Sequence, residues 1–111
     1  MDDLGRAPFR AELDDRDGVL ALRLAGELDA STVPVYERLV GTAVTIDRDV
    51  VVDADELTFI DSSGLHALLT TQRRAQGAGH RVVLRSASRR LRRLLELTDT
   101  VHLFEDEAPD A

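Results

Sequence analysis

The hydrophobic positions near the N-terminus alternate with polar positions and predict two strands. In residues 9–13 apolar and polar side chains alternate, and in 19–24 Val19 and Ala21 are opposed to the three Leu residues; the Asp- and Gly-rich turn 14–18 separates the two segments. This order predicts a hairpin of half-buried strands. Gly26-Glu27-Leu28-Asp29 is expected to close the second strand.

Continuous rather than alternating apolar runs follow in the middle of the chain. Val50-Val51-Val52 lies within 49–53, and an unbroken β-branched run predicts a central strand that is buried on both faces. Ala54-Asp55-Glu56 is expected to interrupt this strand before a second apolar run over 57–60 leads into a helix. A further strand is predicted over 80–84.

Three segments carry apolar residues at helical spacing and are predicted to be helices. Pro34 falls in the first turn of the first helix, where proline is tolerated. Ser31 or Thr32 is expected to cap the first helix, which ends at about Val40 or Val44. The second helix is expected to span about Ser62 to Gln76. Ser86 or Ser88 is expected to cap the third, which ends at about Leu97.

Strands that are joined by helical crossovers imply an α/β fold with a partly parallel sheet. A chain of 111 residues supports a single domain with a modest core, so we expect one domain over 1–111. Residues 1–7 and the acidic stretch 105–111 are expected to be loose termini. Residues 101–104 are expected to form a final turn or a short strand.

Charge and composition narrow the possible functions. The net charge of −7 argues against direct nucleic-acid binding and favours a partner with a basic face. The absence of Cys excludes disulfides and thiolate metal sites and is typical of a reducing compartment. The sequence shows neither an apolar stretch long enough to span a membrane nor the pattern of a signal peptide, so a cytoplasmic location is predicted.

The junction Ile60-Asp61-Ser62-Ser63-Gly64 is the main candidate site. An apolar run stops there and helical spacing begins, which predicts a buried strand that turns directly into a helix with Ser62 at the turn. A helix N-terminus favours an anion, so a phosphoryl group on Ser62 would be well placed. Serine is also an ordinary N-cap residue, and this structural interpretation stands beside the functional one.

Enzymatic chemistry finds little support. The nucleophile elbow G-x-S-x-G is absent, because Ile60 stands where the first Gly would be. His66 lies four residues after Ser62 on the same helical face, but nothing in the sequence orients it as a base, and it is better explained as an exposed residue of a binding face. A P-loop and paired metal-ligand spacings are also absent. We therefore expect no enzyme activity, no cofactor and no metal.

The basic cluster Arg89-Arg90 and Arg92-Arg93 is the other unusual feature. Leu91, Leu94 and Leu95 occupy the opposite side, so the simplest interpretation is the solvent face of an amphipathic helix. Four Arg at a helix N-terminus oppose the helix dipole, which leaves an anionic partner as a secondary interpretation.

The spaced pair G-E-L-D, at Gly26–Asp29, and T-F-I-D-S-S-G-L, at Thr58–Leu65, resembles the STAS domain, and within it the stand-alone anti-sigma factor antagonists. The resemblance extends over about residues 9–104. It implies a mixed sheet of four or five strands with helices packed mainly on one face. It also implies a protein that regulates sigma-factor-dependent transcription by exchanging partners.

In the family that this chain resembles, the first Ser of D-S-S-G is phosphorylated by an anti-sigma factor that is also an ATP-dependent serine kinase. That position is Ser62 here. The resemblance implies that the unphosphorylated chain binds the anti-sigma factor, that phosphorylation prevents this binding, and that a separate phosphatase reverses it. The residues expected at the partner-binding surface are Asp29, Asp61, Ser62, Ser63, Gly64 and His66.

A different function is compatible with the same resemblance. The chain could be a STAS module that does not switch. Such a module would bind a small ligand or a nucleotide, or would serve as a subunit of a transport complex. The intact acceptor serine at position 62 and the free-standing length favour the switch.

Overall fold

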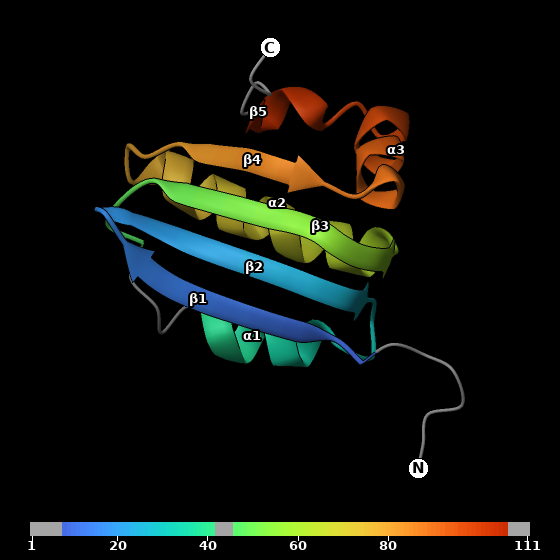
Figure 1. Ribbon diagram of the computed structural model, residues 1–111. Helices are drawn as coiled ribbons and strands as arrows, with labels where there is room; N and C mark the ends of the chain where they lie inside the picture. The colour runs from blue at the N-terminus through green and yellow to red at the C-terminus, as the bar shows by residue number, and fades with distance from the viewer. Residues whose placement is uncertain (1–7, 42–45, 107–111) are drawn as a thin grey trace.

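A computed structural model describes residues 8–41 and 46–106 and shows one five-stranded sheet in the order β1-β2-β3-β4-β5 (Figure 1). β1 is antiparallel to β2, and the other neighbouring strands are parallel. The sequence prediction of a mixed α/β sheet is therefore confirmed. The strands are β1 Arg10–Arg16, β2 Val19–Leu28, β3 Val50–Ile60, β4 Val82–Ala87 and β5 Glu105–Asp106, and the helices are α1 Val33–Val40, α2 Ser62–Gly77, α3 Arg89–Leu97 and the 3-10 helix η1 Val101–Leu103.

The hairpin between β1 and β2 closes with two residues instead of the predicted five-residue turn. Asp17 and Gly18 have positive φ angles of 56° and 81°, and Arg16 pairs with Val19 across the turn. Positive φ at both positions is typical of a type I′ turn, whose twist matches that of the flanking strands. β1 therefore continues to Arg16, and the predicted turn at 14–18 was too long.

The predicted interruption of β3 at 54–56 was also wrong. Arg23 pairs with Asp53 and Ala25 with Glu56, so β3 has one residue more than β2 in this interval. A second shift of this kind follows Gly26. These two bulges accommodate the extra residues without ending the strand, and β3 runs unbroken to Ile60.

One face of the sheet is covered by α1 and α2 (Figure 1). Tyr36 of α1 and Leu68 of α2 are almost fully buried, and they join core residues of the strands such as Leu22 and Val52. Arg23 and Glu12 are exposed members of the strands. Helices thus pack mainly on one face, as predicted, while α3 packs against the second half of β3 beyond the end of β4.

The boundaries near the ends differ from the sequence predictions in detail. β4 begins at Val82 and continues to Ala87, past the predicted end at 84. Ser88 rather than Ser86 caps α3, because its hydroxyl accepts a hydrogen bond from the Leu91 N–H at 3.2 Å. Glu105 and Asp106, predicted to be part of a loose tail, form β5 beside β4. The predictions for 1–7, for 107–111 and for a helix end at Val44 lie outside the described residues.

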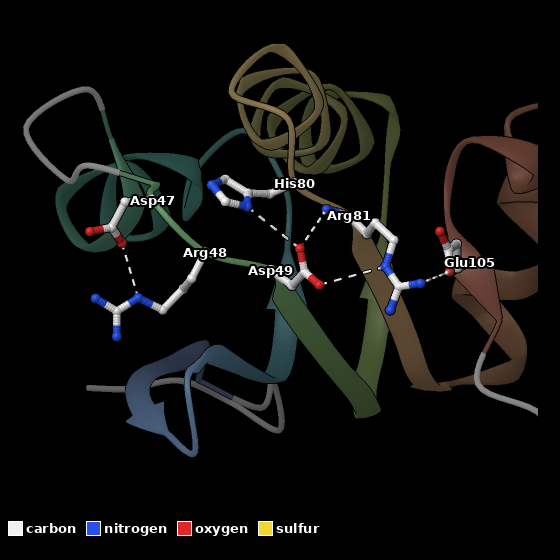
Figure 2. Close-up of polar contacts among 6 residues, drawn as sticks. All are labelled: Asp47, Arg48, Asp49, His80, Arg81 and Glu105. Atoms are coloured by element: carbon white, nitrogen blue, oxygen red, sulfur yellow. Dashed lines mark hydrogen bonds and ion pairs between the residues drawn. The ribbon is translucent and has the colours of Figure 1, made fainter.

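A polar cluster joins the starts of β3, β4 and β5 (Figure 2). Asp49 Oδ1 accepts a hydrogen bond from the Arg81 main-chain N–H at 2.9 Å and lies 3.6 Å from His80 Nδ1. The Arg81 guanidinium lies between Asp49 and Glu105, with N···O distances of 3.5 and 3.4 Å. The hydrogen bond from the Arg81 main chain is the main reason why the pKa of Asp49 is lowered.

In the two described ranges, none of the helices combines the length and the apolar character that a membrane span requires.

Candidate functional site

The ends of β2 and β3 bring Asp29 and Asp61 to one edge of the sheet. Leu28 pairs with Ile60, the last residue of β3. The Asp61 N–H then donates a hydrogen bond to the Leu28 carbonyl oxygen at 3.3 Å. Because the two strands are parallel and end together, the loop that carries Asp29 lies beside the start of α2.

Asp61, and not Ser62, is the N-cap of α2. Asp61 has an extended backbone, and its Oδ1 accepts a hydrogen bond from the Gly64 N–H at 3.0 Å. This is the geometry that an N-cap residue needs, because its side-chain oxygen must reach an unpaired N–H two or three residues later. Ser62 is therefore the first residue of the helix, and the interpretation of Ser62 as a cap was wrong.

The Ser62 hydroxyl is available at the surface. Ser62 and Ser63 are both exposed, and within the described part of the chain neither side chain makes a hydrogen bond. His66 is exposed as well. No hydrogen bond joins His66 to Ser62 among the described residues, so the pairing of base and nucleophile that hydrolysis would require is not formed there. The same residues contain no group of three or more His, Cys, Asp or Glu side chains that could hold a metal ion.

Gly64 differs from its exposed neighbours because it is buried. A Cβ atom at this position would overlap the Leu28 carbonyl oxygen and would lie 2.9 Å from Ile60 Cγ1. Glycine therefore lets the first turn of α2 approach the end of β2 closely. The contact of Gly64 with the end of β2 explains why glycine stands here, whereas the sequence prediction placed Gly64 at the partner-binding surface.

The Asp29 carboxylate orders the loop before α1. Its Oδ1 accepts hydrogen bonds from the Ser31 hydroxyl at 2.7 Å and from the N–H groups of Ser31 and Thr32 at 3.0 and 3.2 Å. The Ser31 hydroxyl is the main reason why the pKa of Asp29 is lowered. Asp29 therefore stays ionised at neutral pH and keeps a fixed negative charge at this edge.

Thr32 precedes α1 as its N-cap, but its side chain makes no capping hydrogen bond. The Thr32 hydroxyl instead accepts a hydrogen bond from the Asp29 N–H at 2.9 Å and donates one to the Glu27 carbonyl oxygen at 2.8 Å. The predicted cap therefore connects the loop back to the end of β2. This role depends on the tertiary position of the loop, which residue type alone does not indicate.

A contact that the sequence did not indicate lies close to this edge. The Arg90 guanidinium of α3 lies 4.8 Å from the centre of the Phe59 ring, and Phe59 precedes Ser62 by three residues. The basic run of α3 is visible in the sequence, but its position next to Phe59 is not. The only available signal was an unusual concentration of Arg in the first turns of a helix.

The chain matches the family model of the STAS domain over residues 10–108. It is 29% identical to the anti-sigma-B factor antagonist of Staphylococcus aureus over 99 residues, which cover 85% of this chain and 91% of the relative. The crystal structure of an anti-sigma factor antagonist from Mycobacterium paratuberculosis is similar, with a TM-score of 0.74 and 28% identity over 93% of this chain and 87% of that one.

The antagonist SpoIIAA in its unphosphorylated form shares the fold, with a TM-score of 0.71 and 23% identity over 92% of this chain and 90% of that chain. Bacillus SpoIIAA in its phosphorylated form also shares the fold, with a TM-score of 0.68 and 23% identity over 92% and 93% of the two chains. The strand order and the junction between β3 and α2 at Ser62 are consistent with the family match over residues 10–108. The chain therefore belongs to the STAS domain family, and its relatives include proteins named anti-sigma factor antagonists.

Proposed function

We propose that this protein is an anti-sigma factor antagonist that phosphorylation at Ser62 switches off. The unphosphorylated form binds an anti-sigma factor that is also an ATP-dependent serine kinase. Phosphorylation of Ser62 weakens this binding, and a phosphoserine phosphatase restores it. The protein itself catalyses no reaction in this scheme, and it acts in the cytoplasm together with these partners.

The observation that carries the proposal is the exposed Ser62 hydroxyl at the first position of α2. It makes no hydrogen bond within the described residues. A kinase can therefore approach it without first breaking an internal contact. Since Asp61 already caps the helix, a phosphoryl group can be added to Ser62 while the cap stays in place.

The charges around Ser62 explain how phosphorylation can act as a switch. Asp61 directly precedes the acceptor, and Asp29 follows the adjacent strand end. A phosphoryl group adds about −1.5 to −2 charges to this acidic edge. A partner surface that complements the unmodified edge then has to accommodate and desolvate a more negative one. In this scheme local charge repulsion and desolvation act as the switch, without a rearrangement of the fold.

The remaining surface residues fit a role in presenting the acceptor. Ser63 and His66 are exposed on the first turns of α2, next to Ser62 along the same helix. Together with Asp29 and Asp61 they form the surface that we assign to the partner. Gly64 contributes to this surface indirectly, by letting α2 start close to the end of β2.

Phosphorylation can be tested directly by intact mass. The protein is mixed with ATP and the anti-sigma factor kinase that is encoded nearest to its gene. We expect a mass increase of one phosphoryl group, placed on Ser62 by peptide mass spectrometry. Ser62→Ala should remain unmodified, whereas the matched control Ser63→Ala should still receive one phosphoryl group, on Ser62. Phosphate located mainly on Ser63, Thr70 or Ser88 would contradict the assignment.

Binding tests the second half of the proposal. The affinity for the same anti-sigma factor is measured for the wild type, for enzymatically phosphorylated wild type and for Ser62→Ala. The wild type and Ser62→Ala should bind alike, and the phosphorylated form should bind much more weakly. Equal affinities of all three forms would exclude a switch and would favour a STAS module that does not switch.

A further inference from the structure

α3 begins with an unusual concentration of positive charge. Arg occupies four of the first five positions of this helix, in a chain whose net charge is −7. Arg89, Arg90 and Arg93 are exposed, and Arg93 lies four residues after Arg89 and three after Arg90, so it is a neighbour of both on the helix surface. We call these three residues the α3 arginine face.

This arrangement is locally unfavourable for the helix. Positive side chains near a helix N-terminus oppose the dipole, and the first turn of α3 contains no acidic residue. Arg89 and Arg93 are like charges four residues apart, a spacing at which they repel each other. Within the described part of the chain, none of the three forms an ion pair. Folding alone does not explain the arrangement, and such departures are typical of functional surfaces.

The α3 arginine face lies at the end of the sheet where the Ser62 helix begins. Figure 1 shows α3 and the start of α2 at the same end. The Ser88 N–H donates a hydrogen bond to the Ala54 carbonyl oxygen at 3.0 Å, which attaches the start of α3 to the middle of β3. Arg90 then reaches forward to Phe59, three residues before Ser62, with its guanidinium 4.8 Å from the ring centre. This cation–π contact holds Arg90 in a defined position near the acceptor.

We propose that the α3 arginine face is a second contact surface for the protein that recognises Ser62, and that it binds an acidic patch on that partner. This inference rests on the proposed function and adds a docking surface to it. The acceptor edge itself is acidic at Asp29 and Asp61, whereas α3 is basic. A partner with a basic patch opposite Ser62 and an acidic patch opposite α3 would bind in one orientation only. The net negative charge of the whole chain makes nucleic acid a poor occupant.

The test is the charge reversal Arg89→Glu together with Arg93→Glu, measured against the purified anti-sigma factor kinase. Association rate and affinity are determined at about 0.05 M and 0.5 M salt, where screening differs strongly. We expect binding to be weaker by at least about tenfold at low salt, mainly through slower association, and the deficit to shrink at high salt. Phosphorylation of Ser62 should slow in parallel.

Arg73→Glu is the matched control. Arg73 is an exposed Arg of α2 without an ion pair among the described residues, eleven positions beyond Ser62. This places it about 16 Å further along the helix axis. Its charge reversal should change affinity by less than about twofold, since it lies outside the proposed surface. The melting temperature of the double variant should not be lower than that of the wild type, because Glu near a helix N-terminus is more favourable than Arg.

Three outcomes would overturn the inference. If the double variant binds like the wild type while Ser62→Ala and the phosphorylated protein differ as expected, only the docking surface is wrong. Arg73→Glu reverses one charge and the double variant two, so a loss of binding free energy in Arg73→Glu that is about half that of the double variant would show a general charge effect. If the wild type binds duplex DNA and the double variant does not, while both bind the anti-sigma factor with the same affinity, the α3 arginine face is a nucleic-acid site. If the wild type fails to bind the anti-sigma factor in any form, the proposed function fails as well.

Discussion

Gly64, in the first turn of α2, lies directly against the main chain of Leu28 at the end of β2. An added Cβ atom would overlap the Leu28 carbonyl oxygen, and this oxygen also accepts the hydrogen bond from the Asp61 N–H. The nearest obstacle is a main-chain atom, which cannot move aside as the end of a flexible side chain can. Gly64→Ala is therefore expected to lower the free energy of unfolding by about 1–3 kcal/mol, the usual cost of overpacking, as measured by chemical denaturation.

Gly77→Ala provides the control for this prediction. Gly77 is the last residue of α2, and a Cβ atom there would meet no other atom within 4 Å. Ala is favoured over Gly in helices, so this substitution should raise the free energy of unfolding by up to about 1 kcal/mol. If Gly64→Ala were also stabilising, the close packing of α2 on β2 would not be the reason for glycine at position 64.

The capping geometry predicts different effects at two adjacent residues. Asp61→Ala removes the oxygen that accepts the Gly64 N–H and should lower the free energy of unfolding by about 0.5–2 kcal/mol. Ser62→Ala removes an exposed hydroxyl that makes no hydrogen bond within the described residues. This substitution should change the free energy of unfolding by less than about 0.5 kcal/mol. Thermal denaturation of both variants checks this order. If Ser62→Ala were as unstable as Asp61→Ala, the N-cap of α2 would be Ser62 and not Asp61.

Periodicity was sufficient to predict the main elements that position the site. Val50-Val51-Val52 marked a buried central strand, and all three residues are buried. The change from an apolar run to helical spacing located the start of α2 correctly at Ser62. These features were predictable because a buried strand and an amphipathic helix each impose a local pattern on the sequence.

Features that depend on pairing between distant segments were not predictable. β3 continues through 54–56 because bulges opposite β2 absorb its extra residues, and one of the two shifts follows Gly26, which has a φ of +91°. The choice between Asp61 and Ser62 as cap depended on backbone angles, since both residue types cap helices well. The contact between Arg90 and Phe59 joins α3 to β3, and the sequence pattern carries no signal for it.

The cluster around Asp49 predicts how stability responds to acid. The Arg81 main-chain N–H donates to Asp49, and Arg81 and His80 lie close to it (Figure 2). The pKa of Asp49 is therefore lower in the folded protein than in the unfolded chain. This lowered pKa stabilises the folded state at pH values above about 4, the pKa of Asp in the unfolded chain. The stabilisation is lost as the pH falls through the pKa of Asp49 in the folded protein.

Asp49→Asn keeps an oxygen that can accept the Arg81 N–H but removes the charge that titrates. The free energy of unfolding of this variant should fall less steeply than that of the wild type between about pH 5 and pH 3. Asp29 and Asp47 also have lowered pKa values, so some acid dependence should remain. Denaturation curves at several pH values measure the slopes, and identical slopes would contradict the role of Asp49.

The last prediction separates the two roles that Asp29 can have. Its carboxylate orders the loop before α1 through Ser31 and Thr32, and it also places a negative charge beside the acceptor. Asp29→Asn retains an oxygen that can accept the same N–H groups, so the melting temperature should barely change. If the charge meets a basic group of the partner, the affinity for the anti-sigma factor and the phosphorylation rate of Ser62 should fall several-fold.

Asp29→Ala completes this comparison, because it removes both the charge and the hydrogen bonds. This variant should show the same loss of affinity as Asp29→Asn and, in addition, a lower melting temperature, since two main-chain N–H groups and the Ser31 hydroxyl lose their acceptor. Normal binding and phosphorylation of Asp29→Asn, together with destabilisation in Asp29→Ala, would limit Asp29 to ordering the loop. The acidic edge that faces the partner would then consist of Asp61 and the phosphorylated Ser62 without a contribution from β2.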